Sequence, residues 1–354
     1  MRYEFTIEPG FERLEGEWED LAGRSGAAPF CQPGWISAWW TAFGTGELAL
    51  LALRRRGALA GLIPLRRGNG RLSSPTNWHT PLYGPVVEDD RAAEELWERL
   101  FRLDVRSVDL AFVDAENGTT DLAADTARRA GRVVAARTLM SSPYVPLDGS
   151  WEDYERSLSR NRRKGIRRRM RSLQAQGEVS AEVRECGEGV DAALEELFEV
   201  EASGWKGKRG TAISSTPATR HFYTEVARWA AGRGTLRLAF LRLDGRPLAC
   251  ELALVDGGVW YSVKAGYEAA AGQFAPGVLL LRETLQRAFS SGLAQYDLLG
   301  PADDYKLGWA RHSARRDWIR ACARSPAGLA EAAVVQARER MRPLARRVRA
   351  RVAP

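Results

Sequence analysis

Two segments of the chain match each other at a fixed spacing of 188 positions. Between residues 42 and 57, eight of sixteen ungapped positions are identical to their counterparts in residues 230–245. The same spacing relates a second segment, in which the identical pairs are Arg99 and Arg287, Phe101 and Phe289, Asp109 and Asp297, and Leu110 and Leu298. A single register held across two separated segments indicates a duplicated fold unit, although a composition rich in Leu, Arg, Ala and Gly raises the chance of identity.

The hydrophobic pattern of both halves alternates strands and helices. In the first half, a strand is predicted at 3–7, helices near 11–22 and from Pro33, and a hairpin from 48–54 and 59–65 that turns at Arg56-Gly57. A helix at 92–103, a strand at 108–113, a helix near 122–130 and strands at 133–138 and 144–147 follow. The pattern predicts a layered α/β fold with lobes at 1–148 and 149–325, and a basic amphipathic helix at 326–354.

The second half contains a strand, a tight loop and a helix in succession. Val259–Tyr267 is rich in β-branched and aromatic residues, Gly272-Gln-Phe-Ala-Pro-Gly277 suits only a loop, and helical periodicity starts at Val278. The first N–H groups of a helix hold phosphate well. We therefore expect a phosphate-bearing donor at this loop, with Gly272, Pro276, Gly277, Val278 and Leu279 as its binding residues. The alternative is that Gly277 is only a turn residue.

The first half differs at the equivalent helix start. There the sequence reads Val87-Glu-Asp-Asp-Arg-Ala92, with acids and no glycine. An anionic donor would be repelled by these carboxylates. The C-terminal lobe is therefore predicted to bind the donor, and the N-terminal lobe to serve as scaffold or acceptor side.

A basic helix is predicted between the lobes, at residues 150–176. Ser150 suits its N-cap, and Gly177 its end. Eight basic residues and no acid lie between Arg160 and Arg171. Without them the 52 basic residues of the chain fall to 44, against 45 acidic residues. The basicity is thus local, and Arg163 and Arg167 are predicted to meet phosphates of a coenzyme or a tRNA; a merely solvated helix face is the alternative.

Several function classes are disfavoured by composition. The four cysteines form no CxxC pair and the three histidines have no ligand spacing, so no metal site is expected. No apolar run reaches the length of about 18 residues that suggests a membrane span, and the N-terminal residues do not resemble a signal peptide. We expect a cytoplasmic protein, with peripheral membrane contact, RNA contact or lobe packing open for the C-terminal helix.

A series of motifs follows in the order seen in a family of bacterial GNAT-type acyltransferases. These are Ser157-Leu-Ser-Arg-Asn-Arg-Arg-Lys-Gly-Ile-Arg-Arg168, Gly204-Trp-Lys-Gly-Lys-Arg-Gly-Thr-Ala-Ile213, Leu243-Asp-Gly-Arg-Pro-Leu-Ala-Cys250, Ala275-Pro-Gly-Val-Leu-Leu280 and Tyr296-Asp-Leu298 with Tyr305-Lys-Leu-Gly-Trp309. The chain resembles the CelD-like, or cellulose-biosynthesis-type, acetyltransferases over residues 150–320 and more loosely before residue 145. It is more distantly similar to Fem-type transferases, which use aminoacyl-tRNA.

The resemblance implies two tandem GNAT-like lobes, each a mixed, mostly antiparallel sheet flanked by helices. It also implies an N-acyltransferase that uses acetyl-CoA or another acyl-CoA and a small-molecule or peptide amine acceptor. The alternative donor is an aminoacyl-tRNA bound through residues 160–171. The usual GNAT pyrophosphate motif, Arg/Gln-x-x-Gly-x-Gly/Ala, is absent, so acyl-CoA use follows from the resemblance alone.

Direct attack of an amine on an acyl donor needs groups that carry protons and N–H or O–H groups that hydrogen-bond the carbonyl oxygen. It needs no nucleophilic side chain. Asp303, Asp304, Tyr305 and Lys306 follow one strand and are the predicted catalytic residues: the acids orient the amine, Tyr305 protonates the leaving thiolate, and Lys306 holds a phosphate or the carbonyl. The alternative reading gives the acids a turn-forming role and makes Tyr305-Lys306 part of a strand.

Contacts with the acceptor are predicted at residues 201–206, near the end of a helix, and at Tyr267, the last residue of a strand. Trp205, Lys206, Glu201 and Tyr267 are the predicted acceptor-binding residues. The alternative is that Trp205-Lys206 end a helix at a glycine stop and that Glu201 is a surface residue.

Overall fold

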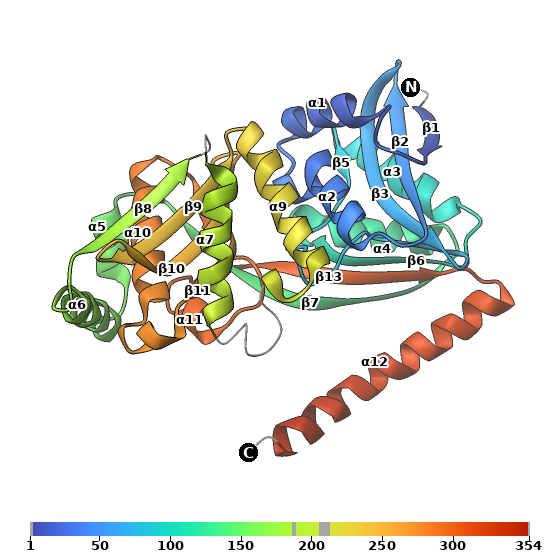
Figure 1. The fold of residues 1–354 in the computed structure, drawn as a ribbon. Coiled ribbons are helices and arrows are strands. Elements are labelled where there is room, and N and C mark those ends of the chain that lie inside the picture. The colour runs from blue at the N-terminus through green and yellow to red at the C-terminus, as the bar shows by residue number, and fades with distance from the viewer. Residues whose placement is uncertain (1–2, 186–188, 205–212, 353–354) are drawn as a thin grey trace. The chain divides into compact units, whose positions relative to one another are not determined.

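The computed structural model describes residues 3–185, 189–204 and 213–352 (Figure 1). The chain divides into two compact units. Unit 1 comprises Met1–Ile36, Gly44–Met140 and Arg315–Pro354, and unit 2 comprises Ser37–Phe43 and Ser141–Ala314. These limits differ from the predicted lobe boundaries, because two strands, β7 (Val133–Pro146) and β13 (His312–Cys322), each contribute residues to both units.

Unit 1 is a mixed sheet with helices on both faces. Its strands are ordered β1-β2-β3-β4-β6-β13, and β5 pairs with β3. The elements of this half of the chain are β1 (Tyr3–Glu8), α1 (Glu15–Ser25), η1 (Pro29–Cys31), α2 (Pro33–Phe43), β2 (Glu47–Arg55), β3 (Ala58–Gly68), β4 (Arg71–Ser73), β5 (Val86–Val87), α3 (Asp90–Arg102), β6 (Ser107–Asp114), η2 (Glu116–Gly118) and α4 (Thr119–Arg129). From Ser37 onward α2 belongs to unit 2. The segment predicted as two strands at 133–147 is the single strand β7.

The last helix, α12 (Pro326–Val352), is joined to unit 1 chiefly through the ion pairs of Glu331, and Glu339 adds a pair with Arg137 at 3.3 Å. Glu331 forms ion pairs with Arg71 at 2.9 Å, Arg106 at 3.1 Å and Arg320 at 3.5 Å. Glu331 Oε1, which pairs with Arg320, also accepts a hydrogen bond from the Ser107 hydroxyl at 2.8 Å. This part of the predicted C-terminal helix therefore packs against its own unit. Within the residues described, no helix combines the length and the apolar character needed to cross a bilayer.

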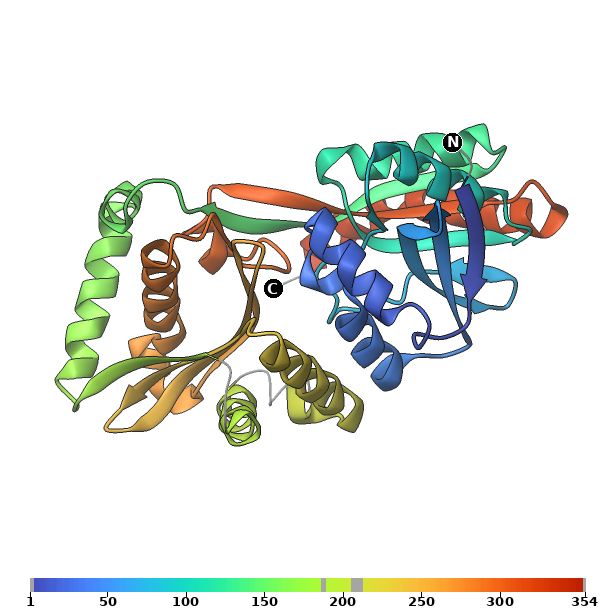
Figure 2. The same cartoon turned by 90° about the horizontal axis from the view of Figure 1, so that it is seen from above.

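Unit 2 repeats the same order of elements. Its strands are ordered β7-β12-β11-β10-β9-β8. The elements are α5 (Trp151–Ser157), α6 (Arg160–Gln174), β8 (Val179–Glu185), α7 (Val190–Ser203), η3 (Ile213–Ser215), α9 (Pro217–Gly232), β9 (Leu236–Leu243), β10 (Arg246–Asp256), β11 (Val259–Tyr267), η4 (Ala269–Phe274), α10 (Pro276–Ser290), β12 (Gln295–Asp297) and α11 (Asp304–Leu307). Figure 2 shows α6 and α10 on one face of this sheet and α7 and α9 on the other.

The strand pairing keeps the spacing of 188 residues. Strand β3 shifted by 188 positions gives the bounds of β10, and β4 shifted likewise gives the first three residues of β11. The parallel pairing of β4 with β6, from Arg71 and Ser107 onward, recurs in β11 and β12 from Val259 and Gln295. The structure thus supports the predicted duplication at the level of register.

The two hairpin turns also match. Arg56-Gly57 and Asp244-Gly245 both have positive φ at both positions, as a tight two-residue turn requires. In each copy, the arginine before the turn donates to the carbonyl of the turn glycine, at 3.2 Å for Arg54 and 3.1 Å for Arg242. This hairpin is the part of the fold that the sequence predicted best.

The predicted helix at 150–176 is two helices. Leu158 is extended (φ −66°, ψ 149°), which ends α5, and the Ser159 hydroxyl accepts a hydrogen bond from Arg162 N to cap α6. Ser150 caps α5 as predicted, accepting from Asp153 N at 3.1 Å. Ile166 and Leu173 of α6 are buried in the core of unit 2. This packing fixes which face of α6 the basic residues occupy.

Candidate functional site

The site in unit 2 begins where two parallel strands part. β11 pairs with β12 only from Val259 to Tyr261, whereas β11 continues to Tyr267. β12 ends at Asp297, whose carboxylate accepts a hydrogen bond from Leu299 N at 2.8 Å. Leu299 has a φ of 49° and turns the chain away. The ladder between β11 and β12 therefore stops at Tyr261, and the two strands diverge beyond it.

A bulge in β11 lies beside this opening. Leu252 of β10 pairs with Lys264 and Ala253 pairs with Ser262, so Val263 is the extra residue. A bulge bends its strand and increases the local twist. The end of β11 is thereby directed away from β12.

The start of α10 borders the opening. Ala275 has left-handed geometry (φ 48°, ψ 56°), and Pro276 is the first helical residue, with no side-chain cap on the helix. Val278 N and Leu279 N already bond to Ala275 O, at 2.9 and 3.3 Å. Proline has no N–H. Gly277 therefore has the first N–H of α10.

A cavity of about 490 Å³ lies at this point, within unit 2. The ends of β11 and α7, the loop before α10, the first turn of α10, and α11 form its walls. The lining residues are Glu201, Gly204, Ala265, Gly266, Tyr267, Gly272, Ala275, Gly277, Val278, Asp303 and Tyr305. Seven of the predicted site residues are thus brought together: Glu201, Tyr267, Gly272, Gly277, Val278, Asp303 and Tyr305.

Two glycines allow α7 to lie directly on β11. A Cβ on Gly266 would lie 2.6 Å from Glu201 Cα, and one on Gly204 would lie 2.8 Å from Tyr267 O. Real side chains do not tolerate such distances to backbone atoms. Glu201 is buried, and its carboxylate accepts a hydrogen bond from Ile213 N at 2.8 Å. The role of Gly266 was missed, because a single glycine in a strand pattern signals close approach only in general terms.

The four predicted catalytic residues lie at α11 but do not share one environment. Asp303 and Tyr305 line the cavity, whereas Asp304 is the exposed first residue of the helix. Lys306 is buried, and its ammonium donates to Leu299 O at 2.5 Å and to Pro301 O at 3.3 Å. Lys306 therefore holds the turn after β12. The segment is helical, so the alternative reading as a strand is wrong.

Tyr305 remains protonated at neutral pH. Partial burial, with the nearby carboxylates of Asp303 and Glu251, raises the pKa of Tyr305 to about 12. A hydroxyl with this pKa can donate a hydrogen bond or a proton and does not act as a base near pH 7.

A buried carboxylate lies behind the cavity. Glu251 on β10 pairs with Ala265, a lining residue, and accepts a hydrogen bond from the Tyr296 hydroxyl at 2.7 Å. The same hydroxyl is 2.9 Å from the Thr284 hydroxyl of α10. Burial raises the pKa of Glu251. Its signal in the sequence is an acid within the apolar strand Ala249–Val255.

The other predicted binding residues lie elsewhere. Pro276 and Leu279 are buried in the core at the base of α10. Arg163 donates to Leu158 O at 3.2 Å, Arg167 is exposed, and neither lines the cavity. Trp205 and Lys206 lie outside the described residues. Across the described residues, no group of three His, Cys, Asp or Glu side chains is placed to hold a metal ion.

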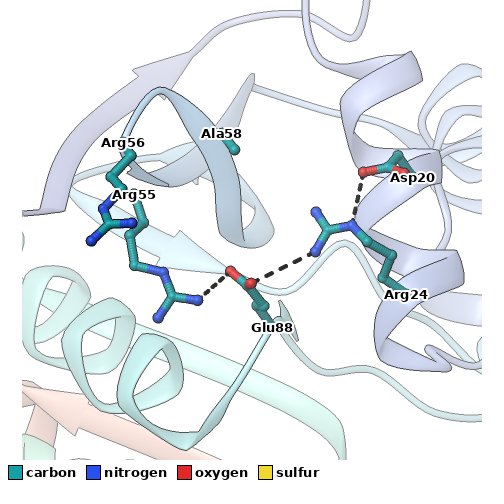
Figure 3. A pocket seen from close by; sticks show the side chains of 6 residues that line it. All are labelled: Asp20, Arg24, Arg55, Arg56, Ala58 and Glu88. Carbon is teal, nitrogen blue, oxygen red and sulfur yellow. Dashed lines mark hydrogen bonds and ion pairs between the residues drawn. The ribbon is translucent and has the colours of Figure 1, made fainter.

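The equivalent helix start in unit 1 is occupied by charged side chains of its own (Figure 3). Asp89 caps α3 by accepting from Ala92 N at 2.8 Å and forms an ion pair with Arg55 at 2.8 Å. Glu88 pairs with Arg55 at 2.7 Å and Arg24 at 3.9 Å. A hollow of about 580 Å³ here is lined by Asp20, Arg24, Arg55, Arg56, Ala58 and Glu88. The hydrogen bond from Ala92 N and the ion pair with Arg55 lower the pKa of Asp89, so its carboxylate remains charged.

The sequence of unit 2 matches a known domain family. Residues 160–307, less than half of the chain, match the model described as "Acetyltransferase (GNAT) domain". This range runs from α6 to α11 and contains every lining residue of the cavity. This part of unit 2 is therefore similar in sequence to GNAT-type acetyltransferase domains. No curated protein matches the chain.

Solved structures share the fold over nearly the whole chain. FemX is similar with a TM-score of 0.58 and 12% identity, covering 90% of this chain and 97% of FemX. The C-terminal domain of an Agrobacterium fabrum protein named for lysylphosphatidylglycerol synthetase is similar with a TM-score of 0.57 and 13% identity, covering 91% and 95%. A Bacteroides thetaiotaomicron protein of unknown function gives 0.58 and 12%, covering 91% and 100%. At these identities the similarity concerns the fold alone, and it agrees with the predicted mixed α/β class.

Proposed function

We propose that unit 2 transfers an acyl group, in the simplest case acetyl, from acyl-CoA to the nitrogen of an amine. The observation that carries the proposal is the cavity in which the end of β11, the start of α10 and Tyr305 meet. The match of residues 160–307 to the GNAT domain supports it. In this proposal the amides of the donor pair with the edge of β11, and its phosphates lie at Gly272–Gly277.

The chemistry follows from the groups that line the cavity. The amine nitrogen attacks the thioester carbonyl carbon, a C–N bond forms, and the C–S bond breaks with its electron pair moving to sulfur. Tyr305, whose hydroxyl is protonated at neutral pH, gives its proton to the leaving thiolate. Asp303, on the same wall, orients the amine and accepts its proton. Backbone N–H groups at the cavity end of β11 stabilise the charge on the carbonyl oxygen.

Titration calorimetry with CoA tests the proposal directly. We expect one CoA to bind per chain, and Tyr267→Ala, which removes a wall of the cavity, to weaken binding. The absence of CoA binding by the intact, monodisperse protein would refute it.

A second candidate donor is an aminoacyl-tRNA, as used by the Fem-type transferases that the sequence resembles. Among the described residues, the eight basic side chains of α6 form no ion pair, which favours an anionic partner. The fold shared with FemX is compatible with this candidate. It predicts tRNA binding that weakens steeply with salt and is lost in Arg163→Glu/Arg167→Glu/Arg171→Glu.

The remaining details belong to the same proposal. The acceptor is a small-molecule or peptide amine, the site of action is cytoplasmic, and the kinship is with cellulose-biosynthesis-type acetyltransferases. Copurified ligand identified by mass spectrometry tests the acceptor class.

A further inference from the structure

The last helix, α12 (red in Figure 1), has an exposed apolar side. Six large hydrophobic side chains are strongly exposed among the described residues, and three of them belong to this helix: Leu329, Val334 and Met341, at 45%, 51% and 57%. Exposed alanines lie between them at intervals of three or four residues, so the set shares one face of the helix. We call this face the α12 strip; it comprises Leu329, Ala330, Ala333, Val334, Ala337 and Met341.

The opposite side of α12 faces unit 1. Glu331, Val335 and Glu339 follow one another at intervals of four residues and lie across the helix from the α12 strip, because each residue turns the helix by about 100°. Glu331 forms the ion pairs with arginines of unit 1 described above, and Val335 is buried. Glu339 pairs with Arg137 at 3.3 Å. These contacts fix the rotation of the helix and leave the α12 strip facing solvent.

Positive charge accompanies the α12 strip. Arg338 and Arg340 are exposed and lie three or four residues from members of the strip, so they adjoin it on the helix surface. Within the described part of the chain, neither of them forms an ion pair, whereas the two acids of the helix, Glu331 and Glu339, are engaged on the side of unit 1. In sequence, residues 338–351 contain seven arginines and one acid. The outer side of α12 thus combines apolar side chains with uncompensated positive charge.

The combination of apolar strip and arginines distinguishes between partners. Nucleic acid would bind the arginines through its phosphates and leave the three large apolar side chains in water. A second copy of the chain would bring arginines against arginines at the same face. An anionic lipid surface suits both features, since its headgroup phosphates attract arginine and the boundary below them accepts apolar side chains.

We propose that α12 binds the surface of an anionic lipid bilayer, with the α12 strip at the boundary between headgroups and acyl chains and with Arg338 and Arg340 at the lipid phosphates. The helix lies along the bilayer, since the membrane interior would be costly for its arginines. The inference concerns a surface of unit 1 and does not depend on acyl transfer by unit 2.

Vesicle flotation tests the inference on the full chain. The partition coefficient is measured by lipid titration, with vesicles of phosphatidylglycerol and phosphatidylcholine in equal parts and with vesicles of phosphatidylcholine alone. Two variants change the strip and its charge separately: Leu329→Gln/Val334→Gln/Met341→Gln and Arg338→Glu/Arg340→Glu. The controls change exposed residues elsewhere in unit 1: Trp78→Gln, whose side chain is apolar and 79% exposed, and Arg13→Glu/Arg91→Glu. Circular dichroism checks that each variant is folded.

We expect the wild-type protein to float with the anionic vesicles and to bind phosphatidylcholine vesicles about tenfold more weakly or less. The apolar variant should lower the partition coefficient on anionic vesicles by about tenfold or more, because the strip supplies the apolar area that is buried. The charge variant should lower it by about tenfold to a hundredfold, since each basic residue near such a surface contributes a factor of about five and reversal adds repulsion. The controls should change it less than about twofold.

The contrary outcomes are distinct from these. Absence of binding to anionic vesicles overturns the inference. A loss in the charge variant with none in the apolar variant also overturns it, because charge alone would serve tRNA equally, and tRNA binding is measured in parallel. Binding that is lost in Lys164→Glu/Arg168→Glu of α6 and kept in both α12 variants assigns the bilayer contact to α6 and overturns the inference. A dimer in sedimentation equilibrium that the apolar variant dissociates would show instead that a second copy covers the strip.

Discussion

The two units share register, hairpin and helix order, yet the same three positions are polar in one core and apolar in the other. In unit 2 Glu251, Tyr296 and Thr284 form a buried hydrogen-bonded group. At 188 residues earlier, unit 1 has Ile63, Val108 and Leu96, all buried. A buried carboxylate costs free energy that an isoleucine does not. Because the fold forms without this polar group in unit 1, its presence beside the cavity of unit 2 points to function rather than to folding.

The N-terminal ends of α3 in unit 1 and α10 in unit 2 also differ, in whether a carboxylate caps the helix. In unit 1 Asp89 caps α3 and is held by Arg55, so this helix start already has an anion. In unit 2 Ala275 leaves α10 without a side-chain cap, and the loop opens on the cavity. The two units therefore differ at the start of this helix and at the buried residues beside the cavity, whereas their hairpins are alike.

The largest effect is expected from a substitution at Tyr305. Unit 1 has no tyrosine in the matching segment, Ala115-Glu-Asn-Gly118. Tyr305→Phe should lower the rate of thiol release from acyl-CoA with an accepted amine by about a hundredfold or more. CoA binding should be unchanged. Because the pKa of Tyr305 is about 12, the tyrosine is protonated throughout pH 6–10, and the ratio of wild-type to variant rates should be constant there. A ratio that falls toward one with rising pH in this range contradicts the proposed role.

Making the unit 2 helix start resemble unit 1 should remove most donor binding. Ala275→Asp places a carboxylate at the N-cap of α10 and should weaken CoA binding by about tenfold to a hundredfold, about 1.4 to 2.7 kcal/mol, through repulsion of the phosphates. Ala275→Asn is the matched neutral control and should lose much less. Equal losses in the two variants, measured by calorimetry, would show that charge is not the cause.

The close approach of α7 to β11 predicts a difference in stability between two strand glycines. Gly266→Ala brings a methyl group within 2.6 Å of Glu201 Cα and should lower the free energy of unfolding of unit 2 by about 1–2 kcal/mol. Gly61→Ala in β3 meets only side chains at 3.5 Å or more and should be tolerated. Thermal denaturation followed by circular dichroism compares them, and an unchanged transition for Gly266→Ala would show that α7 can shift freely.

The smallest effect is expected at Glu251. Burial raises the pKa of its carboxyl, so ionisation disfavours the folded state. The resulting loss of stability is absent below the ordinary carboxyl pKa, grows as pH rises above it, and becomes constant once pH passes the raised value. Glu251→Gln keeps an acceptor for Tyr296 and should equal wild type near pH 4 and be more stable near pH 7, by up to about 1 kcal/mol. Denaturant titrations of both proteins at the two pH values check this. A variant less stable than wild type at pH 7 would contradict the prediction.

The sequence alone indicated the duplication and predicted most element positions, because hydrophobic periodicity and turn residues act locally. The Arg56-Gly57 turn, the strand Val259–Tyr267 and the contrast between the two helix starts were all readable from residue order. It also indicated seven of the residues that line the cavity, since Gly272–Gly277 and Asp303–Tyr305 flank elements whose ends meet in such a fold.

Only the tertiary structure decided which of those residues face the cavity. Lys306 and Tyr305 are neighbours in sequence, yet one ammonium closes the turn after β12 and the other side chain lines the cavity. The division of the chain likewise depended on long-range pairing: the end of β7 pairs with β12, and β13 pairs with β6. These strand pairs join residues more than a hundred positions apart, and the direction of the Lys306 side chain depends on how the chain turns after β12. Local periodicity indicates neither.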